Sequence, residues 1–394
     1  MKLFLETGES VIVAEDAFSS GGEGEVRRVI TSPSKYSNTC AKIYFKSKRT
    51  KLQENKLRYM VLNPPARVKG AGFFIGWPLG LLFDDKKKFI GFIMPLAPTD
   101  SKELVNLTAI KISNKLSPEW HQRFDRSNGT YALLSRLKLM KNIAIPLHLL
   151  HSTGKYVLGD FKPQNVLVTY SGTITLIDMD SIQICEEEKL LYPFTASTDF
   201  YMPPEYYSDG VGRNKSIINI SWDNFAISVV FYQLLFGLHP YVVTPKNIKD
   251  DTSSEIPQNI KNNLFPFGEN SKNIESFPEP HNKFLRLPDK IQRLFKCAFS
   301  KYPNNRPNVE DWGKILNEEI MKCPPVSAPP IPKPTPDHRP KPKPTPKPTT
   351  PSAPPSIKDG ILEVIGAIGG ILFKVLIYFL IWGLIVGIIA LIFT

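Results

Sequence analysis

Three polar residues, Asp160, Lys162 and Asn165, stand close together immediately before the apolar run 166–168. A carboxylate can orient a hydroxyl nucleophile, an ammonium group can neutralise charge on a transferring phosphoryl group, and an amide oxygen can bind Mg²⁺. Phosphoryl transfer needs these three groups together. A polar loop before a strand would contain similar residues, so the interpretation depends on whether further parts of such a site occur in order.

A glycine-rich turn lies near the start of the chain, between the β-rich runs 11–13 and 26–30. Gly21, Gly22 and Gly24 allow the backbone to turn tightly and to bring N–H groups close to phosphate oxygens. An ordinary hairpin turn is the alternative interpretation of the same glycines. The turn therefore indicates a phosphate site only in combination with other parts.

Two charged residues occur in apolar strand-like runs. Lys42 is the single cation in the run 40–45, and burying one charge without a partner is costly. Asp178 ends the apolar run 173–177. An acid at the end of a buried strand is well placed to bind a metal ion or a cation.

In this order, the segments resemble the protein kinase superfamily, and more narrowly its eukaryotic-like (Hanks-type) bacterial serine/threonine kinases with a C-terminal membrane anchor. The resemblance extends from about residue 9 to residue 320. It implies an α+β, two-lobed kinase fold with a small antiparallel β lobe plus one helix and a larger, mainly helical lobe. The larger lobe is expected to contain helices near 131–151, 222–236 and 288–299, which have helix-like apolar spacing.

The resemblance also implies roles for the polar residues. Asp160 and Lys162 are the catalytic pair, since Asp160 would accept the hydroxyl proton and Lys162 would stabilise the transferring phosphoryl group. Asn165 and Asp178 would bind Mg²⁺ or Mn²⁺. Lys42 would hold the α- and β-phosphates of ATP. Its family partner is a glutamate on the next helix, for which Glu54 is the best candidate; a solvated helix charge is the alternative for Glu54.

The remaining nucleotide-binding positions are also implied by the resemblance. They lie in the glycine-rich turn, the flanking strands, the hinge after the small lobe and the strand after the catalytic loop. Ser19 stands where the family usually has its first glycine, and Pro95 removes one backbone donor from the hinge. The set is Ser19, Gly21, Gly22, Gly24, Val26, Ala41, Met94, Leu96 and Leu167.

Four further positions match structural residues of the family. Thr198 corresponds to the threonine that contacts the catalytic aspartate and lysine, and Asp223 to the buried aspartate that braces the catalytic loop. Arg306 corresponds to the arginine that pairs with Glu205 and holds down the activation segment. His151, on the helix before the catalytic loop, is interpreted as a packing residue.

Two departures from the family pattern carry consequences. Leu158 and Gly159 replace the usual His-Arg before the catalytic aspartate. A phosphate on the activation segment would lack that arginine as a partner, so we expect activity not to depend strongly on such phosphorylation. Asp180 replaces the glycine of the family Asp-Phe-Gly triplet and predicts a stiffer loop. A turn cap is the favoured interpretation of Asp180, and a second metal ligand is the alternative.

Composition divides the chain into four expected parts. The kinase lobes are expected at 1–95 and 96–321, with the polar stretches 100–129 and 244–283 as inserts or surface loops. A Pro/Lys-rich segment follows. Because such a segment cannot bury a core, it is expected to be a disordered, extended spacer of up to about 100 Å. A hydrophobic segment ends the chain. The two C-terminal parts are 322–359 and 360–394.

The uncharged run 375–394 has the length of a membrane-spanning helix. Lysines precede it, so the positive-inside rule predicts a single-pass protein of the cell membrane with a cytoplasmic kinase domain. The run 361–373 is too short to span alone, and an interfacial segment, a hairpin arm and an extension of the helix all fit it. Glycines spaced Gly-x-x-x-Gly in this region suggest a homodimer as a further hypothesis.

The expected partners are protein substrates that the sequence does not identify and the lipid bilayer. The net charge of +12 is concentrated in good part in the spacer, which argues against nucleic acid. Four scattered cysteines form no zinc or redox motif. The expected function is phosphoryl transfer from ATP to Ser/Thr hydroxyls in bacterial signalling. A membrane-tethered pseudokinase scaffold and a kinase-gated membrane-perturbing effector are the alternatives.

Overall fold

The computed structural model describes residues 1–209, 217–246 and 256–331. The hydrophobic segment 360–394 and residues 332–359 of the spacer lie outside these residues. The chain divides into the units Met1–Pro334 and Thr335–Thr394, and every described residue belongs to the first. Within the described ranges, none of the helices combines the length and the apolar character that crossing a bilayer requires.

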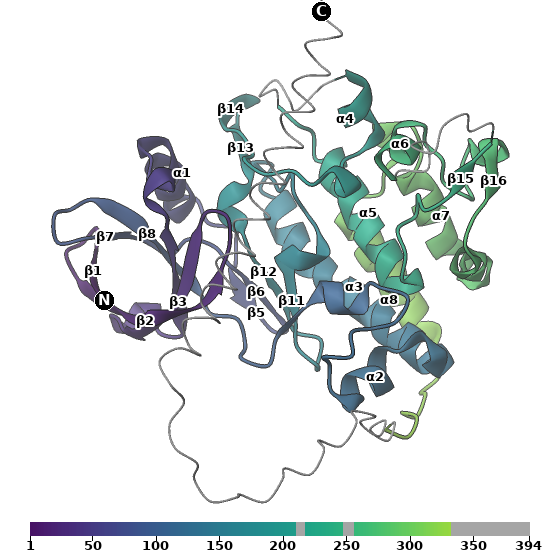
Figure 1. Ribbon diagram of the computed structural model, residues 1–394, viewed down its shortest axis with the longest axis horizontal. Coiled ribbons are helices and arrows are strands. Elements are labelled where there is room, and N and C mark those ends of the chain that lie inside the picture. The colour runs from purple at the N-terminus through teal and green to yellow at the C-terminus, as the bar shows by residue number, and fades with distance from the viewer. Residues whose placement is uncertain (210–216, 247–255, 332–394) are drawn as a thin grey trace, which may run out of the picture. The chain divides into compact units, whose positions relative to one another are not determined.

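The N-terminal part is a closed antiparallel barrel, where the sequence predicted an antiparallel β lobe (Figure 1). In β1 and the first four residues of β2, buried and more exposed residues alternate, so one face of these segments points into the barrel. Leu5, Val11, Ile43 and Ile93 are among the side chains that fill it. In barrel order the strands are β1 (Lys2–Leu5), β2 (Ser10–Ser20), β3 (Gly24–Thr31), β4 (Thr39–Tyr44), β8 (Phe89–Pro95) and β7 (Gly80–Phe83).

One helix, α1 (Lys51–Leu62), packs on β7 and β8. The side chain of Thr50 caps it by accepting a hydrogen bond from the backbone N–H of Gln53. Lys56, Leu57 and Met60 are its buried residues. The helix therefore presents a lysine, together with apolar side chains, to the protein interior.

A second sheet joins segments that are far apart in the sequence. Its strand β6 (Phe73–Ile75) pairs in parallel with β12 (Ile174–Leu176), which follows the catalytic loop. The remaining order is β5 (Lys69–Gly70) beside β6, and β11 (Val166–Val168) and β9 (Lys102–Glu103) beyond β12. This pairing connects the N-terminal part of the chain to the loops that carry the polar residues.

Smaller sheets support the helical part. One consists of β10 (Tyr156–Val157), β13 (Gln183–Glu186) and β14 (Lys189–Tyr192). The other pairs β15 (Thr244–Pro245) with β16 (Ile274–Ser276).

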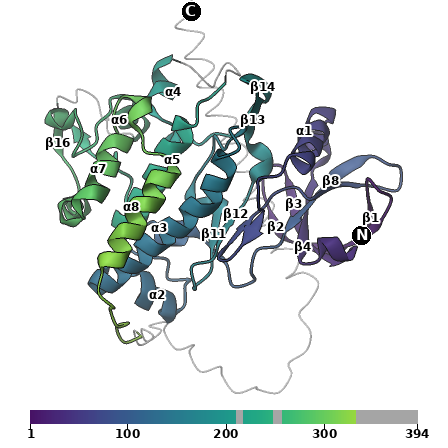
Figure 2. The ribbon, with the colours of Figure 1, turned by 180° about the vertical axis from the view of Figure 1, so that it is seen from behind.

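The helical part is built around α5, which is buried along nearly its whole length because it is apolar on every face. Helices α3 and α8 lie side by side (Figure 2). The helices expected near 131–151, 222–236 and 288–299 are confirmed. The bounds are α2 (Pro118–Phe124), α3 (Gly129–His151), α4 (Pro204–Asp209), α5 (Ser221–Phe236), α6 (Ile256–Lys261), α7 (Asp289–Ala298) and α8 (Val309–Lys322).

The described parts of the polar stretches 100–129 and 244–283, which were expected to be inserts or surface loops, contain regular elements with buried side chains. The first contains α2, whose Trp120 and Phe124 are buried. The second contains α6, in which Ile260 is buried, and Phe265 follows in the core. A few well-spaced apolar side chains are enough to anchor each stretch, although its overall composition is polar.

Two arginines close the C-terminal end of α5. The guanidinium group of Arg126 donates to the carbonyl oxygens of Leu235 (2.8 Å), Gln233 (3.0 Å) and Leu234 (3.1 Å). The fully buried Arg136 also donates to Leu234. Burial lowers the pKa of Arg126 to about 10. The last carbonyl groups of a helix lack partners within the helix, and cations stabilise that end.

We therefore expect Arg126→Ala to lower the free energy of unfolding by about 2–3 kcal/mol, because several carbonyl groups lose their donor. Denaturant unfolding followed by circular dichroism measures this change. Arg293→Ala, on the exposed face of α7, is the matched control and should change stability by less than ~0.5 kcal/mol. Equal effects of the two substitutions would contradict this role of Arg126.

Candidate active site

The glycine-rich turn connects β2 to β3. The backbone N–H of Gly21 donates to the carbonyl oxygen of Gly24 at 3.0 Å, which closes the turn. A Cβ atom on Gly24 would lie 2.2 Å from the carbonyl oxygen of Ile43, so β3 and β4 can approach this closely only with glycine there. Open space surrounds Gly21 and Gly22.

Lys42 lies in the middle of β4, where its backbone pairs with Val26 on β3. Its Nζ donates to Asp178 Oδ1 at 2.9 Å and to both carboxylate oxygens of Asp180, at 2.8 and 2.7 Å. Glu23 Oε2 is a fourth acceptor at 3.4 Å. Burial of the ammonium group opposes its charge, but the carboxylates of Asp180 and Asp178 raise the pKa of Lys42 above its ordinary value. Lys42 is therefore a charged group surrounded by acids.

Glu54 does not contact Lys42, so that part of the sequence prediction is wrong. Its Oε1 accepts hydrogen bonds from Arg58 at 2.9 Å and from Lys51 at 3.0 Å, both on α1 itself. Each step along a helix rotates the side chain by roughly 100°. The side chain of Glu54 therefore points in a different direction from those of Gln53 and Lys56, and its basic partners lie about one helical turn away.

Asp180 has a different role from the turn cap favoured from sequence. It is 1% exposed, and both of its oxygens accept from Lys42. The hydroxyl of Tyr44 also donates to Asp180, and Gln53 Nε2 donates to that hydroxyl at 2.8 Å. Met179, which stands where the family triplet has phenylalanine, is buried. Asp180 is thus a buried ion-pair partner.

The acids around Lys42 also satisfy the geometry of a cation site. Oxygen atoms of Glu23, Asp178 and Asp180 lie within 4.8 Å of one another. The ammonium group of Lys42 bonds to all three of these carboxylates. A metal ion bound to Asp178 would therefore have to share this acid with Lys42.

The catalytic loop brings Asp160, Lys162 and Asn165 together as predicted. Lys162 Nζ donates to Asp160 Oδ2 at 2.7 Å, and Asn165 Nδ2 donates to the backbone oxygen of Asp160 at 2.9 Å. Asp160 is 3% exposed, and its Oδ1 has no hydrogen-bond partner among the described residues. A buried carboxylate oxygen without a donor is an unsatisfied acceptor.

The two groups of polar residues are joined through the hairpin β11–β12. The backbone N–H of Ile177 donates to the carbonyl oxygen of Asn165 at 3.0 Å, which places Asp178 next to Asn165. Lys42 is thus bonded to Asp178, the neighbouring Ile177 is bonded to Asn165, and Asn165 is bonded to Asp160. The predicted residues of phosphoryl-transfer chemistry lie in one place.

The other predicted nucleotide-binding residues lie on the barrel and its exit. Ser19 pairs with Val26 across β2 and β3, and Ala41 precedes Lys42 on β4. Met94 pairs with Cys40, and Leu96 follows β8 and bonds through its backbone N–H to Asn38. Leu167 lies on β11. Their contacts with a nucleotide stay a prediction.

Asp223 braces the catalytic loop, as expected. Its carboxylate accepts from the backbone N–H groups of Leu158 (2.8 Å) and Gly159 (2.9 Å). Gly159 has φ +74°, a left-handed conformation that favours glycine. His151 Nε2 lies 2.9 Å from Asp223 Oδ2. His151 was expected from sequence to be a packing residue. Its contact with Asp223 joins α3 to α5 over 72 residues, so no local pattern reveals it.

The C-terminal part of the activation segment is fixed by two predicted contacts. Arg306, whose side chain is fully buried, forms a bidentate ion pair with Glu205 at 2.7 and 2.8 Å. Thr198 Oγ1 accepts from Lys162 Nζ at 2.9 Å. The segment that carries Thr198 is therefore tied directly to the catalytic lysine.

Lys56 is the residue that sequence reasoning missed. It is 2% exposed, and its Nζ has no hydrogen-bond partner among the described residues. Burial lowers its pKa to about 8, while the negative charges of Asp180 and Glu23 act in the opposite direction. Its place on the buried face of α1, beside Leu57 and Met60, was the available signal.

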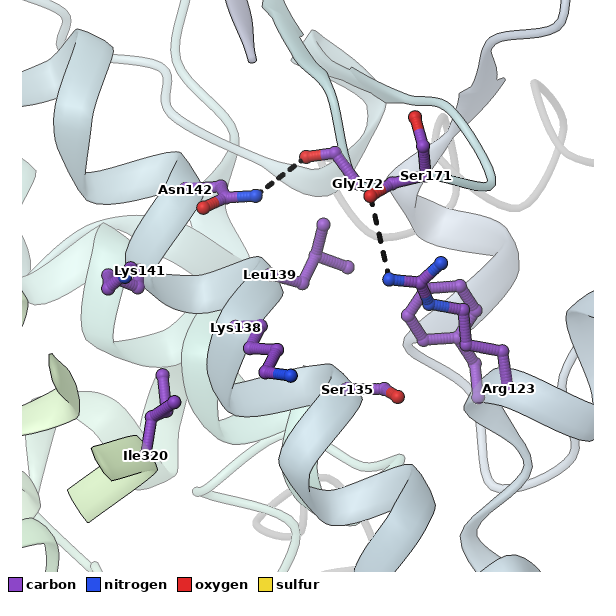
Figure 3. A pocket seen from close by; sticks show the side chains of 10 residues that line it. Arg123, Ser135, Lys138, Leu139, Lys141, Asn142, Ser171, Gly172 and Ile320 are labelled. Carbon is purple, nitrogen blue, oxygen red and sulfur yellow. Dashed lines mark hydrogen bonds between the residues drawn. The ribbon is translucent and has the colours of Figure 1, made fainter. Parts of the chain in front are cut away.

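A cavity of about 200 Å³ lies at the opposite end of the β11–β12 hairpin from Asn165 and Asp178 (Figure 3). Asn142 Nδ2 donates there to the backbone oxygen of Gly172 at 2.9 Å. Lys138 and Lys141 line it from α3. The site chemistry described above uses none of its residues.

Comparison with known proteins identifies the class. Residues 103–319, more than half of the chain, match the family described as Protein kinase domain. The chain therefore belongs to the protein kinase family. The matched region includes the catalytic loop, Asp178 and Arg306, whereas the barrel with Lys42 precedes it.

Individual relatives are more distant. Citron rho-interacting kinase of Rattus norvegicus is 27% identical over 155 residues, which are 39% of this chain and 7% of that protein. Serine/threonine-protein kinase RUNKEL of Arabidopsis thaliana is 31% identical over 127 residues (31% and 9%). Ribosomal protein S6 kinase alpha-3 of Homo sapiens is 24% identical over 182 residues (46% and 23%). The chain spans less than a quarter of each of these relatives, all from eukaryotes.

Activity should depend little on phosphorylation of the exposed residues Thr195 and Ser197, because Gly159 stands where an arginine would bind the phosphate. Thr195→Ala and Ser197→Ala should keep kcat/KM within about twofold, whereas Thr198→Ala should lose about tenfold or more with its contact to Lys162. Steady-state phosphorylation of a generic acceptor protein, before and after phosphatase treatment, measures this. A tenfold loss on phosphatase treatment would contradict the expectation.

Proposed function

We propose that this protein is an ATP-dependent protein kinase that transfers the γ-phosphoryl group to Ser/Thr hydroxyls of protein substrates. The observation that carries the proposal is the series of bonds that brings these residues together: Lys42 bonds to Asp178, the adjacent Ile177 bonds to Asn165, and Asn165 bonds to Asp160. Phosphoryl transfer depends mostly on positioning and electrostatic stabilisation, and these residues supply both.

Asp160 is the group that accepts the hydroxyl proton. Its Oδ2 is held by Lys162, while its buried Oδ1 is an acceptor without a donor among the described residues. A substrate hydroxyl that donates to Oδ1 would satisfy this oxygen and would be oriented for attack. Lys162 lies at the same carboxylate, where its charge can stabilise the transferring group.

The donor set fits a hard divalent cation such as Mg²⁺ or Mn²⁺. Asn165 uses its Nδ2 to bind the backbone of Asp160, so its amide oxygen is the atom left for a metal. The side chain of Asp178 is 36% exposed and provides carboxylate oxygen. The metal would neutralise charge on the ATP phosphates, and Lys42 would hold these phosphates from the side of the barrel.

The preference for Ser/Thr is supported by the spacing of the catalytic loop. Lys162 stands two positions after Asp160 and bonds to Thr198, an arrangement that resembles Ser/Thr kinases. The printed name of the Arabidopsis relative, a serine/threonine-protein kinase, agrees with this choice. The identity of the protein substrate is left open by this proposal.

We also propose that the hydrophobic segment 360–394 anchors the kinase to the cell membrane, with the kinase domain in the cytoplasm. The support is the uncharged run 375–394 and the lysines that precede it. A homodimer formed through the Gly-x-x-x-Gly spacing is part of the same proposal. A role in bacterial signalling is supported only by the sequence resemblance.

Asp160→Asn and Lys42→Ala should each reduce phosphoryl transfer by about a thousandfold or more, because each removes a group that orients or neutralises the reacting atoms. Transfer from radiolabelled ATP to a generic acceptor protein measures the rate. Lys138→Met, an exposed position on α3, is the control and should keep the wild-type rate. If either active-site variant transferred phosphate at the wild-type rate, the assignment of this protein as a kinase would be contradicted.

A further inference from the structure

Lys42, the lysine of the proposed phosphate site, has its acidic partners in the loop that contains Asp178 and Asp180, not on helix α1. Lys42 Nζ binds both oxygens of Asp180, at 2.8 and 2.7 Å, and one oxygen of Asp178, at 2.9 Å. The two acids belong to one short segment, in which residues 179–181 form a 3₁₀ turn. The pairing is therefore made within the loop that also carries the metal-binding acid.

Helix α1 offers no carboxylate to Lys42. Glu54 is bound by Arg58 and Lys51 of the same helix. The charged residue that α1 buries is Lys56, whose ammonium group has no hydrogen-bond partner among the described residues. The negative charge of Asp180 opposes the lowering of the Lys56 pKa by burial. Asp180 itself is paired directly with Lys42, which offsets the cost of burying its charge.

Two hydrogen bonds donated by uncharged side chains connect α1 to Asp180. Gln53 Nε2 donates to the hydroxyl of Tyr44, and this hydroxyl donates to Asp180. Tyr44 is on β4, two residues after Lys42, so barrel, helix and loop meet at one carboxylate. Lys42 donates to both carboxylate oxygens of Asp180, and Tyr44 donates to Oδ2, so neither carboxylate oxygen lacks a donor.

We propose that Asp180 is the positioning residue that holds Lys42 toward the ATP phosphates, so that Asp178, which also contacts Lys42, can bind the metal. In this arrangement α1 contributes no acid to Lys42, and the charged residue that it buries is Lys56. The proposal deepens the proposed kinase function and rests on it. It also implies that the ion pair of Lys42 does not depend on a rotation of α1.

Loss of the Asp180 carboxylate would have two effects. Lys42 would keep only Asp178 and Glu23, which are both more exposed than Asp180, so Asp178 would be its nearest anion as well as the metal ligand. The buried Lys56 would also lose the attraction of a negative charge, while the repulsion between Lys42 and Lys56 would remain.

The first test is steady-state kinetics of the full-length protein with ATP as the varied substrate. Asp180→Asn and Asp180→Gly should raise KM for ATP and lower kcat/KM at least tenfold. Glu54→Gln is the matched control on α1 and should stay within twofold of wild type. The double variant Asp180→Gly/Lys56→Glu moves the acid to α1, and it should recover at least fivefold over Asp180→Gly.

The rescue distinguishes positioning from a merely structural role, because relocating the acid cannot restore a lost packing contact of Asp180. A double variant no better than Asp180→Gly would overturn the proposal. So would an Asp180→Asn variant within twofold of wild type, or a tenfold loss in Glu54→Gln. If the Asp180 variants do not fold, Tyr44→Phe removes one donor to Asp180 and should raise KM for ATP about threefold; an unchanged KM would overturn the proposal.

Calorimetric titration with Mg–ATP separates this proposal from the kinase function itself. If wild type transfers no phosphate but binds Mg–ATP at least tenfold more tightly than Asp180→Asn, the role of Asp180 stands and the catalytic assignment fails. If wild type transfers phosphate and the two proteins bind Mg–ATP equally, only the role of Asp180 fails. A wild-type protein that binds no nucleotide overturns both.

Discussion

The structure depends most on one buried cation. Lys42 lies in a strand that is buried at every position, and an ammonium group there is tolerated only with anions in contact. Asp178 and Asp180 provide them from a loop about 136 residues later in the chain. This ion pair joins the barrel to the helical part at the point where the chemistry takes place. The ion pair that compensates the buried charge of Lys42 therefore also brings the residues of the site together.

A second set of buried charges positions the catalytic loop. Asp223, near the start of the buried helix α5, receives two backbone N–H groups of the loop and lies beside His151. Arg306 and Glu205 fix the end of the activation segment, and Lys162 links this segment to Asp160. Most of these contacts join segments that are far apart in the chain, so the geometry at Asp160 depends on the core of the helical part.

The sequence predicted the residues of the candidate site more reliably than it predicted which residues they contact. Short spacing and residue type were sufficient for Asp160 and Asp178, because their roles follow from local motifs. The partner of Lys42 was predicted wrongly as Glu54, since the choice among neighbouring helix residues depends on the rotation of α1 against the barrel. Asp180 was predicted as a turn cap for the related reason that a local pattern does not reveal a contact with a distant strand. The pairing of β6 with β12 and the closure of the barrel are long-range features of the same kind.

The dependence of ATP affinity on magnesium tests the central claim most directly, because Asp178 must serve both Lys42 and the metal. Calorimetry would compare ATP binding with and without Mg²⁺ in wild type and in Asp178→Asn. We predict that Mg²⁺ tightens binding at least about tenfold in wild type and has little effect in Asp178→Asn. An equal effect of Mg²⁺ in the two proteins would contradict the account, because it would mean that the metal does not bind at Asp178.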